Sequence, residues 1–257
     1  MRQRLCFLLL AVLISSSAFA QTAAPVRDPN AITFLQQVVA AMGGRALTPS
    51  TGFIATGSVQ PLPGTGLTAG TFTFTDQAGE FREMFQFGNV SKVIVSGHGQ
   101  PAITRGTTTQ SLPPFVVFAN APFHVPAVCL MLVLSDPNYS ISLAGPSAVN
   151  SVPAIKVHVS KDVDETSAVT SPQDWYFTNS GVPLRVEYRS PDATRPERYG
   201  VESLDYPSFT VVSQVAVPPT MTWSADGRPL ATIVISSVQF NTTISPVAFD
   251  APQGGLQ

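Results

Sequence analysis

One change in the spacing of apolar residues limits the fold of this chain more than any other feature. Between residues 28 and 44 the apolar side chains recur at helical spacing, as on one face of an amphipathic helix. From Thr51 onward the period is two, as in a strand with one buried face. The sequence therefore predicts an early helix followed by a domain of mostly antiparallel strands.

The predicted helix has clear signals at both ends. Asp28-Pro29-Asn30 offers side chains that cap free backbone N–H groups, and Gly43-Gly44 ends the pattern. Its apolar stripe must be buried against another element. The stripe comprises Ala31, Phe34, Leu35, Val38, Val39 and Met42.

The strands are predicted from alternation and from turn residues. Phe72 and Phe74 alternate with threonines and share one face of their strand. Asn179-Ser180-Gly181 and Asp226-Gly227 are typical of hairpin turns between strands. Residues 102–109 are expected to form one further strand. Residues 125–134 are apolar on all sides and predict a short buried helix, with a buried strand as the alternative.

The N-terminal segment has the pattern of a cleavable export signal. Arg2 and Arg4 precede an apolar run over residues 5–14, and Ala18-Phe19-Ala20 gives the small-x-small cleavage pattern. The run is shorter than the roughly 20 apolar residues of a membrane-spanning helix. We therefore predict a signal peptide over residues 1–20, one domain over 21–257 and a periplasmic or secreted protein that is not an integral membrane protein.

The cysteines and charges narrow the options further. Cys6 lies inside the predicted signal, so there is no lipobox, and Cys129 has apolar neighbours that predict a buried thiol. Only 12% of residues are charged, and the formal net charge is −2. A mildly acidic chain argues against nucleic acid and anionic lipid headgroups as partners.

No constellation of catalytic or metal-binding residues is recognisable in the sequence. The histidines, His98, His124 and His158, are not at metal-ligand spacing and have no cysteine nearby. We expect a protein that is not an enzyme and that has no cofactor and no metal.

The order of several short motifs resembles a known superfamily. The chain carries, in order, Ala40-Ala41-Met42-Gly43-Gly44, Thr56-Gly57, Phe81-Arg82-Glu83-Met84, Pro137-Asn138-Tyr139, Trp175-Tyr176-Phe177, Gly181-Val182-Pro183-Leu184-Arg185-Val186, Val217-Pro218-Pro219-Thr220-Met221 and Phe249-Asp250-Ala251-Pro252. These motifs are similar to those of the LolA-like superfamily of outer-membrane lipoprotein carriers and their exported relatives. The resemblance implies a mainly β (α+β) fold: a strongly curved antiparallel sheet, or incomplete barrel, covered by an N-terminal helix and one short buried helix.

The resemblance also implies a binding role for the concave face of the sheet. Members of the superfamily bind lipids, lipid-modified proteins or partner proteins there. No functional residue of the carriers can be matched to a position here. The candidates that line such a cavity are mostly aromatic, and the alternative is that they only fill the core. They are Phe34, Phe72, Phe74, Glu83, Phe85, Phe87, Trp175, Phe177, Tyr188 and Trp223.

Glu83 stands out because it shares a face with Phe81, Phe85 and Phe87. A buried carboxylate costs several kcal/mol unless it is paired. Either Arg82 or Arg185 is its partner, or the face is partly wet, or a β-bulge turns Glu83 outward.

Two functional hypotheses follow from these observations. The first is an exported cell-envelope protein that binds an apolar ligand, a lipid or an acyl chain, on the concave sheet face. The alternative is a non-catalytic envelope interaction module with a filled core and a protein partner.

Overall fold

The computed structural model describes residues 24–48, 51–97, 100–112, 123–161, 172–191 and 199–251. The predicted signal peptide, residues 1–20, lies outside these ranges, and so does His98.

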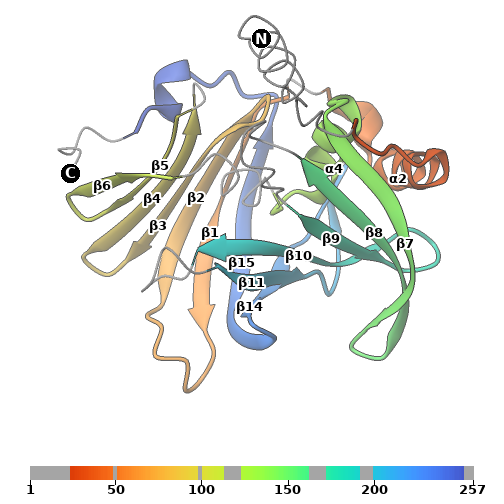
Figure 1. Ribbon diagram of the computed structural model, residues 1–257. Coiled ribbons are helices and arrows are strands. Elements are labelled where there is room, and N and C mark those ends of the chain that lie inside the picture. The colour runs from red at the N-terminus through yellow and green to blue at the C-terminus, as the bar shows by residue number, and fades with distance from the viewer. Residues whose placement is uncertain are drawn as a thin grey trace, which may run out of the picture.

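The fold is dominated by one antiparallel sheet of 13 strands (Figure 1). Its order is β6-β5-β4-β3-β2-β1-β15-β14-β11-β10-β9-β8-β7. The strands are β1 (Phe53–Pro61), β2 (Gly70–Gln77), β3 (Glu80–Phe87), β4 (Val90–Gly97), β5 (Gln100–Arg105), β6 (Thr108–Ser111), β7 (Tyr139–Val149), β8 (Val152–Lys161), β9 (Gln173–Phe177), β10 (Pro183–Pro191), β11 (Tyr199–Asp205), β14 (Thr220–Ala225) and β15 (Arg228–Phe240). A separate small hairpin pairs β12 (Thr210–Val212) with β13 (Val215–Val217).

The sheet joins two halves of the chain at its middle. Strands β1 to β6 are sequential neighbours, and so are β7 to β10. The last strand, β15, pairs with β1, from Phe53↔Phe240 to Pro61↔Ala231, and so links the halves. In Figure 1 the two helices lie beside β7–β9, away from β2–β6. The predicted mainly antiparallel β fold with an N-terminal helix and a short buried helix is confirmed. Its strong curvature stays a prediction.

Helix α2 (Pro29–Ala41) begins and ends where the sequence predicts. Asp28 accepts a hydrogen bond from the Asn30 backbone N–H at 2.9 Å, and Pro29 occupies the first turn. Gly43 has a φ of +85°, and a Cβ there would lie 1.8 Å from the Gln214 carbonyl oxygen. Only glycine fits this close approach. The helix buries its apolar stripe against α4 and β7, except that Phe34 is only partly buried.

Helix α4 (Pro126–Ser135) confirms the short buried helix and excludes the strand alternative. Pro126 stands in its first turn, where a missing N–H costs nothing. Cys129 is buried in it as predicted, and burial raises the pKa of its thiol well above the usual value. None of the helices in the ranges given above is long and apolar enough to cross a bilayer.

Arg27 fastens the end of α4 to the start of the described chain. Its guanidinium donates hydrogen bonds to the carbonyl oxygens of Leu134, Asp136 and Tyr139 at 2.9 to 3.1 Å. The last carbonyls of a helix lack partners within the helix, and the bond to Leu134 satisfies one of them.

One strand prediction is wrong. Residues 102–109 form a hairpin of β5 and β6, which turns at Gly106 with a φ of +58°. Glycine takes this backbone conformation without steric cost, which the alternation pattern does not reveal.

Candidate functional site

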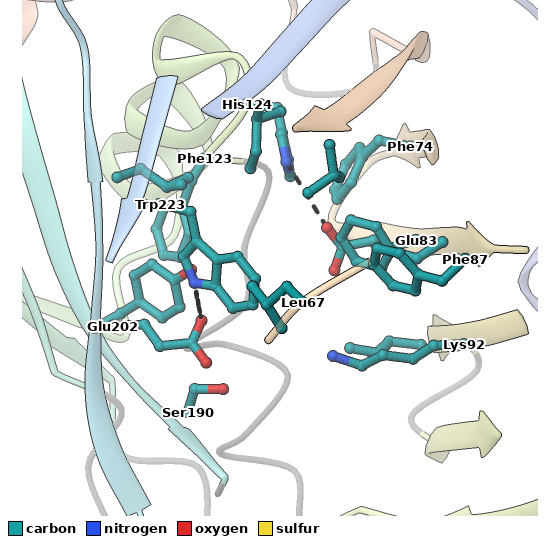
Figure 2. Close-up of a pocket in the computed structure, with 16 residues that line it drawn as sticks. Leu67, Phe74, Glu83, Phe87, Lys92, Phe123, His124, Ser190, Glu202 and Trp223 are labelled. Atoms are coloured by element: carbon teal, nitrogen blue, oxygen red, sulfur yellow. Dashed lines mark hydrogen bonds and ion pairs between the residues drawn. The ribbon is translucent and has the colours of Figure 1, made fainter. Parts of the chain in front are cut away.

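A cavity of about 230 Å³ opens on one face of the sheet (Figure 2). Its wall comes from eight strands, from the β1–β2 loop and from the residues before α4. The apolar lining consists of Val59, Leu67, Phe74, Phe85, Phe87, Ile94, Phe123, Tyr188, Leu204, Trp223 and Ile233. The polar lining consists of Glu83, Lys92, His124, Ser190 and Glu202.

The eight lining strands are consecutive in the sheet, from β4 to β10. Strands lie about 4.8 Å apart, so seven spacings would separate β4 from β10 by about 34 Å in a flat sheet. Lys92 of β4 and Ser190 of β10 nevertheless border one cavity. Because the first and the last of these eight strands border the same cavity, the lining favours the predicted curvature of the sheet.

Six of the ten predicted site residues line this cavity. They are Phe74, Glu83, Phe85, Phe87, Tyr188 and Trp223. The alternation of β2 and β3 is the signal that identified the first four, because it gives their common face.

The other four predicted residues do not line it. Phe72, Trp175 and Phe177 are buried in the core. Phe34 of α2 packs its ring edge-on against Phe177, with centroids 5.3 Å apart. Alternation gives the face of a strand but not which part of that face α2 and α4 cover.

Glu83 points into the cavity and is 9% exposed. The β2–β3 register runs without a shift from Thr71↔Gln86 to Gln77↔Glu80, so the bulge considered for Glu83 is wrong. Both predicted arginine partners are also wrong. Arg82 lies on the opposite face of β3 and donates to the carbonyls of Ala248 and Asp250, and Arg185 pairs with Asp205.

Burial sets the protonation of Glu83. Desolvation raises its pKa to about 7, an effect that the charge of Lys92 opposes and the charge of Glu202 reinforces. At neutral pH this carboxyl group is therefore divided between its acid and its carboxylate form.

His124, which the sequence did not indicate as a site residue, lies next to Glu83. Its ring lies against two phenyl rings, with centroids 5.5 Å from Phe72 and 4.9 Å from Phe74. Burial lowers its pKa to about 4, so the imidazole is neutral at pH 7. Its position between Phe123 and Val125, just before an apolar helix, was the available signal.

His124 and Glu83 face each other without bonding directly. The distance from His124 Nε2 to Glu83 Oε1 is 3.8 Å, which is too long for a hydrogen bond. Within the part of the chain that the structure describes, neither ring nitrogen of His124 has a hydrogen-bond partner. Figure 2 shows the imidazole directed at the carboxyl group.

Glu202 stabilises the cavity wall opposite Glu83 by two hydrogen bonds. Its carboxylate accepts one hydrogen bond from Trp223 Nε1 at 2.9 Å and another from the Tyr188 hydroxyl at 3.2 Å. These contacts fix two of the aromatic lining residues. Sequence reasoning missed Glu202 because its immediate neighbours, Val201 and Ser203, are not aromatic and gave no signal of a cavity wall.

Lys92 and Leu67 border the cavity nearer to solvent. Lys92 Nζ lies 5.6 Å from the centroid of the Phe85 ring, and that ring stacks on Phe87 at 5.8 Å. Leu67, from the glycine-rich β1–β2 loop, is 41% exposed yet lines the cavity. Across residues 24–251, as far as they are described, no three His, Cys, Asp or Glu side chains form a metal-binding group.

Two solved structures share the fold of this chain. A DUF1329 family protein from Desulfovibrio piger matches with a TM-score of 0.52 and 11% identity, over 88% of this chain and 99% of that one. A putative outer membrane lipoprotein-sorting protein domain from Vibrio parahaemolyticus matches with the same TM-score and identity, over 86% and 96%. This chain has a LolA-like fold. The predicted resemblance is thereby confirmed for the fold.

A further match carries the superfamily name. A LolA superfamily protein from Nitrosomonas europaea aligns with a TM-score of 0.44 and 10% identity, over 86% of this chain and 97% of that one. No protein-family model and no curated protein matches the sequence. The two matches with a TM-score of 0.52 show a common fold, and at 11% identity they assign no role to any residue of this chain.

Proposed function

We propose that this protein is an exported carrier that binds an apolar ligand, a lipid or an acyl chain, in the cavity on the sheet face. The observation that carries the proposal is the cavity itself: about 230 Å³ of space bordered by phenylalanine and tryptophan side chains, which the residues that the structure describes do not fill. Its size is just below the roughly 300–1,000 Å³ of typical ligand pockets.

The chemistry of the lining supports an apolar ligand. Eleven of the sixteen lining residues are apolar or aromatic, and the single lysine lies near solvent. Transferring hydrocarbon from water to such a wall gains about 25 cal/mol for each Å² of apolar surface that is buried. A chain that enters the cavity therefore gains free energy without needing a charged partner inside.

The fold and the N-terminus support the carrier role. The fold is shared with a protein named as a lipoprotein-sorting domain, so a lipid-modified protein is a partner class as well as a free lipid. The export pattern over residues 1–20 supports a location in the periplasm or outside the cell for the proposed single domain, residues 21–257. The alternative, an interaction module with a filled core, offers no reason for the open cavity.

The test combines extraction with direct binding. Protein purified from the periplasm is extracted with organic solvent, and the extract is analysed by mass spectrometry. In parallel, the purified protein is titrated with a fluorescent fatty acid. We expect co-purified lipid and saturable uptake. Repeated absence of both would refute the proposal.

A pair of matched variants tests whether the ligand binds in the cavity. Ser190→Trp inserts an indole into its wall and should abolish uptake. Ser142→Trp makes the same substitution beside His158, in the β7–β8 register and outside the cavity, and should leave uptake intact. Equal uptake by both variants would show that the fatty acid binds outside the cavity.

A further inference from the structure

The positions of His124 and Glu83 in the cavity wall indicate that the ligand has a polar group. We infer that the bound molecule carries a neutral oxygen group, a hydroxyl or a carbonyl, within its apolar part, and that this oxygen bridges His124 Nε2 and Glu83 Oε1. This inference rests on the proposed function and specifies its ligand class: an acyl compound with an internal hydroxyl, ester or amide, rather than an unsubstituted hydrocarbon chain.

The first support is the missing partner of His124. The residue is 5% exposed, and both ring nitrogens lack a hydrogen-bond partner in the described part of the protein. A buried donor or acceptor without a partner loses its hydration and regains nothing, so most native structures avoid it. Because His124 borders the cavity and points at Glu83, the partner can come from a bound molecule.

The second support is the distance between the two side chains. An oxygen atom about 2.8 Å from each partner fits between two atoms that lie 3.8 Å apart. Glu83 lies on the other side of this gap. The unbroken β2–β3 register determines the face of β3 from which its side chain projects. One ligand oxygen can therefore contact both side chains.

The third support is the charge balance, which selects a neutral group. His124 is neutral at pH 7, and Glu83 is divided there between its acid form and its carboxylate form. A protonated carboxyl and a neutral imidazole can both donate to a carbonyl, or one can donate to a hydroxyl while the other accepts from it. A ligand carboxylate would lose its hydration here without an opposite charge to pair with, and a ligand ammonium would find one only in the ionised fraction of Glu83. Lys92 and Glu202 lie elsewhere on the wall, and Glu202 already accepts two hydrogen bonds.

The experiment compares probes that differ only in one hydroxyl group. Dodecanoate and a set of its positional hydroxy isomers, up to omega-hydroxydodecanoate, compete with a fluorescent fatty acid for the purified protein. We expect one isomer to bind about tenfold more tightly than dodecanoate, since one additional buried hydrogen bond accounts for a factor of that size.

The variants show whether the selectivity depends on these two side chains. In His124→Phe and Glu83→Leu the preference for the hydroxy isomer should disappear, so that the ratio of its affinity to that of dodecanoate falls to about one. His158→Phe is the matched control, because His158 pairs with Asp174 outside the cavity and its loss should leave the preference unchanged. Circular dichroism establishes that each variant is folded.

A measurement on the unmodified chain covers the case in which a variant does not fold. The ¹⁵N resonances of the His124 imidazole should shift when the preferred isomer is added and shift less with dodecanoate. Equal affinity for all isomers, or a preference that persists in both variants, would overturn the inference and leave the carrier proposal standing. Failure of every probe to bind would overturn the carrier proposal as well.

Discussion

Trp223 donates a hydrogen bond from its indole Nε1 to the Glu202 carboxylate at 2.9 Å, across the pair of strands β11 and β14. The bond holds one indole at the cavity wall. The other tryptophan, Trp175, is fully buried and stacks on Phe177 at a centroid distance of 6.2 Å. The two indoles of the chain therefore stand in different environments, one of them open to a ligand.

This difference makes Trp223 a reporter of binding. Addition of an apolar probe should change the intrinsic fluorescence, because the probe displaces water from beside the Trp223 ring. Trp223→Phe should remove most of this change in a fluorescence titration, and Trp175→Phe should preserve it. A signal that follows Trp175 instead would mean that the probe binds outside the cavity.

Phe74 should contribute far more to stability than Phe85, although both line the cavity. Phe74 is 1% exposed and lies between Phe53 and Phe81, with ring centroids 5.7 and 5.8 Å away. Phe74→Ala should lower the free energy of unfolding by about 3 to 5 kcal/mol. Phe85→Ala removes a partly exposed ring and should cost about 1 kcal/mol.

Urea unfolding measures both losses, and probe binding is then measured on each folded variant. Binding should weaken in Phe85→Ala because its ring borders the open part of the cavity. If Phe74→Ala unfolds easily but binds unchanged, Phe74 belongs to the core and not to the site.

Glu83 and His124 should give stability opposite dependences on pH. The folded pKa of Glu83, about 7, lies above the ordinary value of 4.5. Its contribution is present below pH 4.5 and is lost as the pH rises to 7, because the unfolded chain ionises first. The folded pKa of His124, about 4, lies below 6.5, so its contribution is present above pH 6.5 and is lost as the pH falls to 4.

Unfolding curves recorded from pH 4 to pH 8 separate the two effects. Relative to the unmodified protein, Glu83→Gln should reduce the loss on the alkaline side, and His124→Phe the loss on the acid side, each by about 1 to 3 kcal/mol. Asp76, whose pKa burial raises well above its usual value, adds to the alkaline loss in all three proteins and cancels in the comparison. Parallel curves for all three proteins would contradict the assigned protonation states.

Leu67 should act on binding without acting on folding. It is 41% exposed in the β1–β2 loop and borders the cavity. Leu67→Ser should weaken the binding of an apolar probe several-fold, because it removes apolar contact area from the wall, and should change the unfolding free energy by less than about 0.5 kcal/mol. Leu143→Ser is the matched control, since Leu143 of β7 is 40% exposed and lies away from the cavity. Equal binding by the two variants would exclude the loop from the site.

The sequence by itself determined the local structure of this protein. Caps and glycines defined α2, period-two alternation placed Phe74, Glu83, Phe85 and Phe87 on one face, and Asp226-Gly227 located a hairpin between β14 and β15. These features depend on residues a few positions apart, so the linear pattern records them. The Gly106 turn was missed because a single glycine in an alternating run gives little signal.

Only the tertiary structure decided which of these side chains meet. Glu83 of β3 and His124 of the segment before α4 lie side by side at the cavity wall although they are far apart in the sequence. Lys92 and Ser190 border the same cavity because eight consecutive strands of one sheet form its wall. The same packing covers Phe72, Trp175 and Phe177 with neighbouring side chains and leaves the wall at Phe85 open. Contacts between residues far apart in the chain follow from strand order and helix placement, which no local spacing specifies.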